Sequence, residues 1–421
     1  MNVPSGGVRL SGAAINSRAS HLMSLTLSFI FGLSLLTVLA VIAWLCALVW
    51  LRFAGLALQG ITTRKPLARA QSAEPASAAP LVSVIVPARN EAHRILDQSV
   101  RSILAQDYEN LEVIAINDRS TDATESVLRS IAETDARLRV INGVETPEGW
   151  RGKPYALQQA LEASRGEWVL TVDADMMLER EAVSTAVEKA RAGNFEVLTL
   201  MPHLETGSFW ERIFTSTWVF VLLGTYPFMV LNNPKTKQAM AFGGFSLIRR
   251  DALGRIGDFG AVRAEVNETV RLAELLKASG AAYRIEHGPN LIRTRMQNNF
   301  AEVWEFLSRS MFSGLGHSVP LALLSVFIGY IFAVAPPFVA AFCALMIAQG
   351  IAGEWLRLLI PTLLIWIMQV VTLLLICKNF RIPGRYALTT PLGFALFYSA
   401  LLSSAVNAVF GRGATWKERK V

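Results

Sequence analysis

Two carboxylates stand one residue apart, Asp173 and Asp175, at the end of the apolar run in VLTVDADMML (169–178). Alternate side chains of a strand share one face about 7 Å apart, so both carboxylates would point the same way. Two such groups repel each other, and carboxylate oxygens are the ligands that hard divalent cations prefer. The pair therefore indicates a cation site, with two surface acids of a solvated loop as the alternative.

The segments around this pair alternate between strand-like and helix-like patterns. The predicted strands are LVSVIVP (81–87), LEVIAIN (111–117), LRVI (138–141) and EWVLTVD (167–173), and the predicted helices are 91–105, 122–136 and 154–164. Such alternation predicts an α/β domain whose mostly parallel sheet is covered by helices. Ligands of these sheets bind beyond the carboxyl ends of the strands.

Polar residues follow three of the predicted strands. They lie in PARNE (87–91), NDRSTD (117–122) and DAD (173–175), so acidic groups should meet at one edge of the sheet. Neither GxGxxG nor GxxxxGK[ST] follows the first strand, which argues against a dinucleotide-binding fold or a P-loop. Phosphate would then be held chiefly by a metal ion and by basic side chains.

Composition predicts membrane segments outside this domain. Of the 421 residues, 52% are hydrophobic and 17% charged, which is too apolar for a wholly soluble chain. Four apolar stretches reach the length of about 20 residues that a membrane-spanning helix needs. The expected organisation begins with a tail (1–23), a first span (24–51) and a basic, Ala-, Pro- and Ser-rich linker (52–80). A soluble domain (81–316), three more spans (319–349, 358–377 and 387–410) and a basic tail (411–421) follow. Pro336 and Pro337 predict a kink in the second span.

Cysteine and histidine indicate no metal or redox centre. The cysteines, Cys46, Cys343 and Cys377, lie in or beside apolar stretches without metal or disulfide spacing, and the five histidines show no ligand pattern. The formal charge of +7 favours a membrane surface with anionic partners. We expect no nucleic-acid partner.

Five motifs, VSVIVPARNE, IAINDRSTDAT, GWRGKPYAL, TVDADMML and FGGFSLIRRDAL, occur in an order that resembles the inverting family 2 glycosyltransferases with the GT-A fold. The likeness covers about residues 81–316. It is greatest to membrane-bound lipid glycosyltransferases, the ceramide glucosyltransferase and the hopanoid- and carotenoid-associated enzymes. The resemblance implies a Rossmann-like GT-A domain with one N-terminal and about three C-terminal transmembrane helices. It also implies transfer of one sugar from a nucleotide diphosphate sugar, expected to be a UDP-sugar, to a lipid hydroxyl.

The resemblance further implies roles for single residues. Around the base and ribose of the nucleotide it places Pro87, Arg89, Asn90, Glu91 and Asp118. Lys153 would approach the donor phosphates as a compact positive charge, with a solvated loop lysine as the alternative. Asp173 would contact the ribose or the sugar. Asp175 would bind Mg²⁺ or Mn²⁺ on the diphosphate, where the metal offsets the charge of the departing nucleotide.

The catalytic base is expected in AEVNETVRLAELLKASG (264–280). Relatives carry Glu-Asp before the Leu-Ala of this helix, which aligns with Glu268 and Thr269. A threonine hydroxyl cannot deprotonate an alcohol near neutral pH, so Glu268, or else Glu265, would have to serve. Both glutamates could equally face solvent at a helix start, where the dipole favours carboxylates. Thr269 also leaves open a catalytically impaired membrane scaffold that binds nucleotide sugar.

On the acceptor side the resemblance places Gly243, Gly244 and Arg295, with a position near anionic headgroups as the alternative for Arg295. The apolar, aromatic stretch 208–231 is expected either against the bilayer, where a lipid could enter, or as a buried helix. The QxxRW motif of polymer synthases is absent from RTRMQNNFAEVWEF (293–306), which disfavours a polysaccharide synthase. Transfer to a polyprenyl phosphate stays an alternative.

A nucleotide-sugar user needs its domain in the cytosol. We therefore expect a multi-pass protein of the cell (inner) membrane with a cytoplasmic catalytic domain. The basic residues beside the predicted spans agree with the positive-inside rule, namely Arg52, Arg64, Lys65, Arg69, Lys378, Arg381 and Arg385. Four spans leave both termini outside, where the basic tail violates that rule.

Overall fold

The computed structural model describes residues 35–62, 65–69, 79–313, 315, 318–351, 353–410, 415–416 and 419–420. The chain divides into two compact units. The first holds the residues up to 51 together with 335–368, and the second holds 52–334 together with 369–421. All predicted site residues belong to the second unit.

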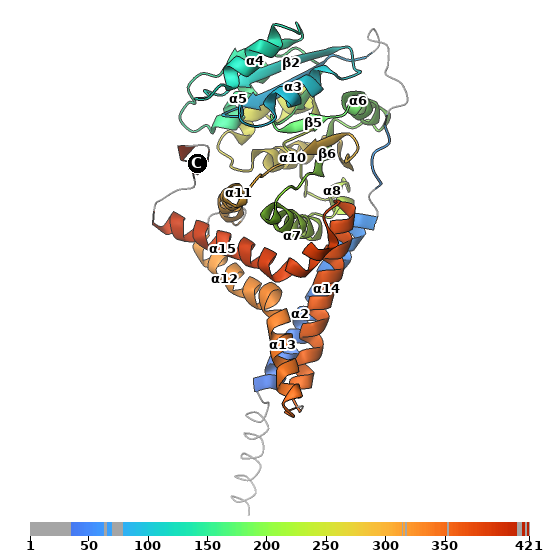
Figure 1. The fold of residues 1–421 in the computed structure, drawn as a ribbon. Coiled ribbons are helices and arrows are strands. Elements are labelled where there is room, and N and C mark those ends of the chain that lie inside the picture. Colours follow the sequence, from blue (N-terminus) through green and yellow to red (C-terminus); the bar gives the residue numbers. More distant parts are fainter. Residues whose placement is uncertain are drawn as a thin grey trace, which may run out of the picture. The chain divides into compact units, whose positions relative to one another are not determined.

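A seven-stranded sheet forms the centre of the second unit (Figure 1). In spatial order the strands are β3 (Leu138–Asn142), β2 (Leu111–Asn117), β1 (Val82–Ala88), β4 (Trp168–Thr171), β8 (Ser246–Arg249), β6 (Val197–Met201) and β9 (Tyr283–His287). Neighbouring strands are parallel except where β8 pairs with β4 and with β6. The prediction of a mostly parallel α/β sheet is therefore confirmed.

Helices follow the strands in sequence and pack on the sheet (Figure 1). They are α3 (Leu96–Leu104), α4 (Thr124–Ala132), α5 (Gly152–Glu162), α6 (Ala182–Ala192), α9 (Arg250–Arg255), the 3₁₀ turn η1 (Asp258–Val262) and α10 (Glu268–Ala278). The helix predicted for 91–105 begins only at Leu96. The backbone amides of Glu91 and Ala92 are bound instead by Thr124 Oγ1 at 2.8 Å and Asp122 Oδ2 at 3.1 Å. These bonds hold the first strand end against the second.

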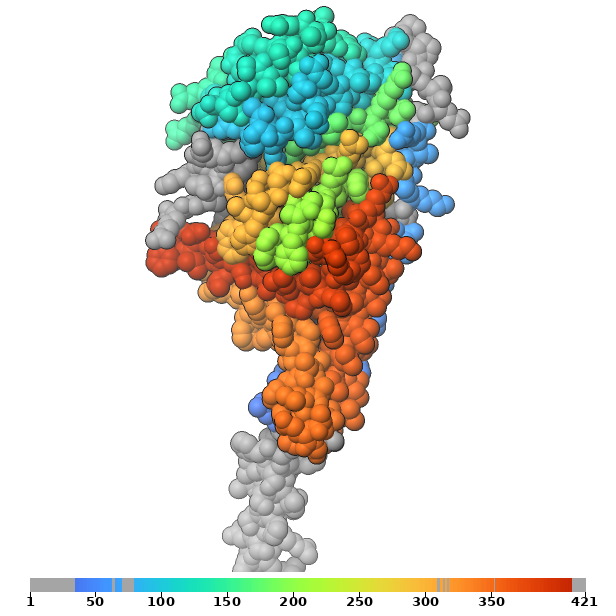
Figure 2. Space-filling view, in the orientation of Figure 1, coloured from blue at the N-terminus to red at the C-terminus, as the bar shows by residue number. Residues whose placement is uncertain are grey.

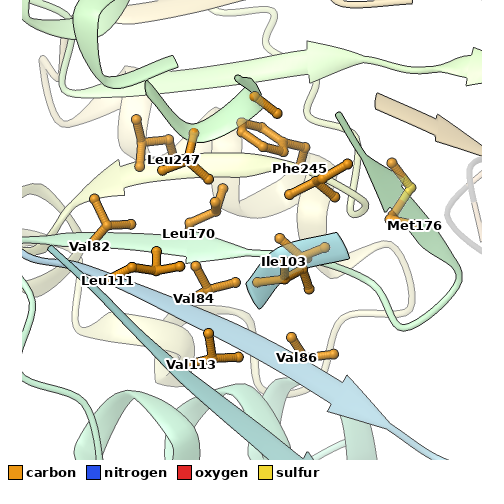
Figure 3. Packing of buried hydrophobic residues seen from close by; sticks show 14 of the residues in the cluster. Val82, Val84, Val86, Ile103, Leu111, Val113, Leu170, Met176, Phe245 and Leu247 are labelled. Atoms are coloured by element: carbon orange, nitrogen blue, oxygen red, sulfur yellow. The ribbon is translucent and has the colours of Figure 1, made fainter. Parts of the chain in front are cut away.

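The core of the domain lies between the sheet and its helices. Both β1 and β2 bury six of seven residues, as strands covered on both faces must. Val82, Val84 and Val86 alternate along β1 and point to one face, where Ile103 of α3 and Phe245 join them (Figure 3). Each fully buried side chain of this size contributes about 1.5–3 kcal/mol. The polar strand ends are thereby attached to a rigid base.

The acidic pair lies in a turn. β4 ends at Thr171, and the amide of Met176 donates to the Asp173 carbonyl at 3.1 Å, so Asp173 and Asp175 precede β5 (Met176–Leu178). This corrects the expectation that both carboxylates share one face of a strand. A second, three-stranded sheet holds the turn, because β5 pairs with β10 (Ile292–Thr294), which also pairs with β7 (His203–Leu204).

Apolar helices of the same unit pack together below this domain (Figure 1). They are α7 (Phe209–Thr225), α8 (Phe228–Leu231), α11 (Phe300–Ser313), α12 (Val319–Gly329) and α15 (Thr390–Val409). α15 contacts α7, α11 and α12, and in Figure 2 the red surface of α15 adjoins the green surface of α7. Most residues of α7 are buried. The stretch 208–231 is therefore a buried helical part of the unit, one of the two expected outcomes.

In the part of the chain that the structure describes, four helices are long and apolar enough to cross a membrane: Leu35–Thr62, Val319–Ala348, Trp355–Asn379 and Gly384–Val409. One precedes and three follow the α/β domain, as predicted. The first helix, α2, continues to Thr62, so residues 52–62 are helical and not part of a linker. Their sequence RFAGLALQGIT contains no proline that would end the helix. Residues 24–34 of the predicted span, the tail 1–23 and positions 70–78 of the predicted linker lie outside the described residues.

The second of these helices is interrupted where the sequence predicts a kink. It consists of α12, a π-helical segment (Tyr330–Val334) and α13 (Ala335–Ala348). The elements after it are α14 (Trp355–Asn379), the 3₁₀ turn η3 (Gly384–Thr389), α15 and the short strands β11 (Thr415–Trp416) and β12 (Arg419–Lys420). Pro337 has no N–H for the carbonyl four residues earlier, that of Ala333. The fully buried Gln369 of α14 donates its Nε2 to this carbonyl at 3.2 Å.

Candidate functional site

A cavity of about 1010 Å³ opens at the carboxyl ends of β1, β2 and β4. The residues that line it include twelve of the thirteen predicted site residues: Pro87, Arg89, Asn90, Glu91, Asp118, Lys153, Asp173, Asp175, Gly243, Gly244, Glu265 and Glu268. The structure therefore brings these twelve residues together in one cavity, and their individual roles stay predictions.

Lys153 is the central cation of the cavity. Its Nζ lies 2.7 Å from Asp173 Oδ1 and 3.1 Å from Glu268 Oε1. The three residues come from the first turn of α5, the turn after β4 and the first residue of α10. Burial lowers the pKa of Lys153, but the two carboxylates outweigh it and hold this pKa above its usual value. The ammonium therefore remains charged and joins the two sides of the cavity.

Asp175 sits in a field of excess negative charge. The pKa of Asp175 is raised to about 7, first by burial and then by the charges of Asp173 and Glu91, whereas Arg94 and Lys153 act to lower it. Among the described residues no group of three His, Cys, Asp or Glu side chains could enclose a metal ion. The described residues that line the cavity nevertheless include eight carboxylates against five Arg and Lys side chains. These residues fit a divalent cation that takes its other ligands from a bound substrate.

Arg94 links Asp175 to a helix remote in sequence. Its Nη1 lies 3.2 Å from Asp175 Oδ2, and its Nη2 lies 2.8 Å from Glu302 Oε2 on α11 and 3.1 Å from the carbonyl of Met296. Sequence reasoning missed both Arg94 and Glu302. A separation of 208 residues leaves no local signal for such a pair.

The first two strand ends are tied together by polar contacts. Arg89 Nη1 donates to the carbonyls of Asp118 at 2.8 Å and Arg119 at 3.1 Å, and Arg119 Nη2 donates to Asp118 Oδ1 at 3.0 Å. Asn90 and Arg119 have φ of 50° and 52°. Asparagine adopts this left-handed region readily, whereas arginine does so at a cost that functional sites often carry. The edge where a nucleotide base is expected is thus fixed before any ligand binds.

The two candidate bases differ in their surroundings. The Glu268 side chain is 13% exposed, and its Oε1 accepts hydrogen bonds from Lys153 and, at 3.1 Å, from Thr269 Oγ1. Glu265 is half-exposed, 4.0 Å from Arg271 Nε. The structure therefore places Glu268 in the interior of the cavity and Glu265 at its edge.

Gly243 and Gly244 lie where side chains would not fit. A Cβ at Gly243 would come within 2.8 Å of Asp173 Oδ2 and 3.2 Å of Lys153 Nζ. A Cβ at Gly244 would overlap the sulfur of Met176. Both glycines therefore permit the close approach of backbone to the acidic turn.

Arg295 is the predicted site residue that the structure places outside the cavity lining. Its Nε and Nη2 each lie 2.9 Å from the carboxylate of Glu211, which is buried at the start of α7. Glu211 also accepts the amides of Gly207 at 2.8 Å and Ser208 at 2.9 Å. Burial would raise the pKa of Glu211, but these donors lower it to about 2. The expected acceptor-side arginine is thus held in a helix cap.

An apolar wall completes the cavity. It is formed by Pro202, Phe242, Met296 and Phe306. Behind it Trp218 of α7 packs edge-on against Phe242 and Phe306, at centroid distances of 6.5 and 6.3 Å. Phe306 also packs against the apolar cluster that α7 shares with α11 and α15. The wall is therefore continuous with the apolar helices.

Comparisons with known proteins agree with this arrangement. Residues 83–257 match the family model described as glycosyl transferase family 2. A curated relative, the 4,4'-diaponeurosporenoate glycosyltransferase of Staphylococcus aureus (strain USA300), is 26% identical over 249 residues, which cover 58% of this chain and 64% of that protein. The protein of the same name from strain MRSA252 gives the same figures. The chain thus matches less than two thirds of these relatives' length.

A solved structure shares the fold. The mannosyltransferase of Pyrobaculum calidifontis, in complex with GDP-Man and Mn²⁺, superposes with a TM-score of 0.51 at 19% identity, covering 90% of this chain and all of the other. At this identity the likeness concerns the fold alone, an α/β domain of GT-A type with a mostly parallel sheet.

Proposed function

We propose, on the premise that residues 83–257 are a glycosyl transferase family 2 domain, that this chain is a membrane-bound, inverting glycosyltransferase. It transfers one sugar from a nucleotide diphosphate sugar, a UDP-sugar, to the hydroxyl of a lipid. The observation that carries the proposal is the bridge from Asp173 through Lys153 to Glu268. This bridge puts a persistent positive charge and a carboxylate side by side in one cavity.

The reaction is a single displacement at the anomeric carbon. The acceptor oxygen forms a bond to that carbon while the bond to the diphosphate oxygen breaks, and the nucleotide diphosphate leaves with the electron pair. Glu268 takes the proton of the acceptor hydroxyl. Lys153 holds its charge beside both carboxylates, where a departing diphosphate gains from it. Asp175 would hold a divalent cation, Mg²⁺ or Mn²⁺, which would supply further positive charge to the leaving group.

The charge of the cavity supports a cation-dependent donor. A diphosphate adds negative charge to a cavity in which carboxylates already outnumber basic side chains. Such a ligand binds only if positive charge enters with it, because close like charges repel strongly at the edge of a protein interior. The strand-end residues Arg89, Asn90 and Asp118 offer donors and acceptors to the base and ribose.

The apolar wall supports a lipid acceptor. Phe242 and Phe306 present aromatic surface to the cavity, and Trp218 connects this surface to helices apolar enough for a membrane. Glu302 and Glu305 of α11 line the same side. Their negative charge opposes a phosphate group, which favours an alcohol over a polyprenyl phosphate.

A nucleotide-sugar-binding scaffold without turnover is the second candidate. The observation that favours it is the pair of donors on Glu268, Lys153 Nζ and Thr269 Oγ1, both at 3.1 Å. Both donors contact the same oxygen, Oε1, which is then not open to the hydroxyl of an acceptor. Either candidate places the domain in the cytosol, where nucleotide sugars occur, at the inner membrane of the cell.

The test is transfer from radiolabelled UDP- and GDP-sugars into host lipid extract by purified protein with Mn²⁺, Mg²⁺ or a chelator. We expect a labelled lipid that depends on the cation and that Asp175→Asn and Glu268→Gln both abolish at an unchanged unfolding temperature. Glu265→Gln is the matched control and should retain transfer. If Glu265→Gln alone abolishes transfer, the base is assigned wrongly. Cation-dependent UDP binding without product supports the scaffold, and the absence of both refutes the proposal.

A further inference from the structure

Two arginines meet at one buried tyrosine outside the cavity. Tyr386 belongs to η3, the turn before α15, and is 5% exposed. The guanidinium carbon of Arg212 on α7 lies 5.6 Å from the centre of its ring, and that of Arg385 lies 5.7 Å from it. Arg212 Nη1 also donates to the Tyr386 hydroxyl at 3.3 Å. Both guanidinium groups therefore lie against one aromatic ring.

Neither guanidinium pairs with a carboxylate of the described residues. Among the described residues no Asp or Glu lies within 4.0 Å of Arg212 or Arg385, whereas Arg293 and Arg295 both have acidic partners. Arg212 Nε is buried and donates to no atom of the described residues. A buried donor without an acceptor costs free energy, which an oxygen ligand of Arg212 would recover. Within the described residues, the two arginines therefore carry positive charge without an acidic partner.

The position of the two arginines in the fold indicates which kind of anion they could bind. Arg385 lies in the turn between α14 and α15, two helices apolar enough to cross a membrane, and Lys378 and Arg381 precede it without any acidic residue between Lys378 and Phe410. Phe209 packs on the Tyr386 ring at 5.8 Å and is 48% exposed, and Leu388 is 61% exposed. In Figure 1 α7 and α15 lie side by side. Basic residues joined to exposed apolar groups at the end of a span are typical of the headgroup zone.

We propose that Arg212, Tyr386 and Arg385 form a binding site for the headgroup phosphate of an anionic phospholipid. Guanidinium forks match the oxygens of a phosphate, and the Arg212 Nε is a donor that such an oxygen satisfies. Arg385 is exposed and can turn toward the bound phosphate. Phe209 and Leu388 offer apolar contacts to the lipid chains. The site is separate from the cavity, since none of the three residues lines it, and it does not depend on the proposed transfer reaction.

The test measures lipid binding by the full-length protein in detergent, by native mass spectrometry and by thermal unfolding. The probes are phosphatidylglycerol, phosphatidylcholine and inorganic phosphate at equal concentrations. Phosphatidylglycerol should bind and raise the unfolding temperature, and phosphatidylcholine should not. Arg385→Gln and Arg212→Gln should each weaken phosphatidylglycerol binding by about tenfold, as expected for loss of one charge-assisted contact.

Matched variants separate this site from general charge effects. Arg180→Gln removes an exposed arginine of the α/β domain and should leave lipid binding unchanged. Arg385 is exposed on a turn, so Arg385→Gln should fold like the wild type. It should therefore show weaker phosphatidylglycerol binding even if Arg212→Gln does not fold. Equal phosphatidylglycerol binding in wild type and Arg385→Gln would overturn the site. Stabilisation by inorganic phosphate equal to that by phosphatidylglycerol would overturn the assignment to a lipid.

Discussion

The contact between Arg295 and Glu211 gives the sharpest test of the site, because sequence reasoning places Arg295 beside the acceptor and the structure places it in a helix cap. The pKa of Glu211 falls from an ordinary value near 4.5 to about 2. A shift of this size corresponds to about 3 kcal/mol. Arg295 shares this contribution with the donors of Gly207 and Ser208, and it is 41% exposed, so solvent screens part of its own interaction. We therefore expect Arg295→Gln to lower the free energy of unfolding by about 1–2 kcal/mol.

The assay is thermal unfolding of the purified protein, followed by tryptophan fluorescence, together with the KM for a lipid acceptor. Arg295→Gln should lower Tm by a few degrees and leave KM unchanged. Arg293→Gln is the matched control, since Arg293 is 43% exposed and its acidic partners, Glu179 and Glu205, are themselves 40% and 46% exposed. Exposed pairs of this kind contribute about 0–1 kcal/mol. An unchanged Tm with a raised KM in Arg295→Gln would refute the structural role.

The pH dependence of the same contact has a definite sign. A carboxyl whose pKa is lowered by folding stabilises the protein fully above its unfolded pKa and loses that contribution as the pH falls toward its folded pKa. For Glu211 the loss should occur between about pH 5 and pH 2. The Tm difference between wild type and Arg295→Gln should therefore be constant from pH 7 to pH 5 and shrink below pH 5. A difference that grows on acidification would contradict this linkage.

Two further substitutions test the acidic turn. Gly243→Ala places a Cβ within 2.8 Å of Asp173 Oδ2, so we expect transfer to fall at least tenfold with little change in Tm, and full activity would contradict the close approach. Arg94→Gln removes the cation 3.2 Å from Asp175, so Mn²⁺ should bind about tenfold tighter in a titration at pH 8.5, where the carboxyl is ionised. Weaker Mn²⁺ binding would show instead that Arg94 positions this carboxylate.

The sequence predicts those parts of the site that depend on residue patterns within short segments. PARNE and NDRSTD each follow an apolar run that predicts a buried strand. Two parallel strands end at the same edge of a sheet, so the contact between Arg89 and Asp118 follows from this prediction. The same holds for the four apolar helices, whose length and composition are local properties. These features need no knowledge of distant contacts.

Contacts between remote segments could not be predicted in this way. Arg94 meets Glu302, and Arg295 meets Glu211, through packing of α11 and α7 that no local pattern encodes. The antiparallel direction of β8 is likewise set by the long connection before it. The motifs at the strand ends therefore predict where the cavity lies, whereas the partners of its charged residues depend on the fold.

The hydrogen bond from Gln369 to the carbonyl of Ala333 bears on how the chain enters a membrane during synthesis. In an apolar medium a carbonyl without a donor is costly, and Pro337 cannot supply one. The helix that contains Ala333 is synthesised before α14. The Ala333 carbonyl can therefore accept this hydrogen bond only after Gln369 has been synthesised. Residues 319–348 and 355–379 should therefore leave the translocon as a hairpin. We expect residues 319–348 to integrate poorly into a membrane when residues 355–379 are absent. Gln369→Leu should also reduce the membrane integration of residues 319–348 in the full chain.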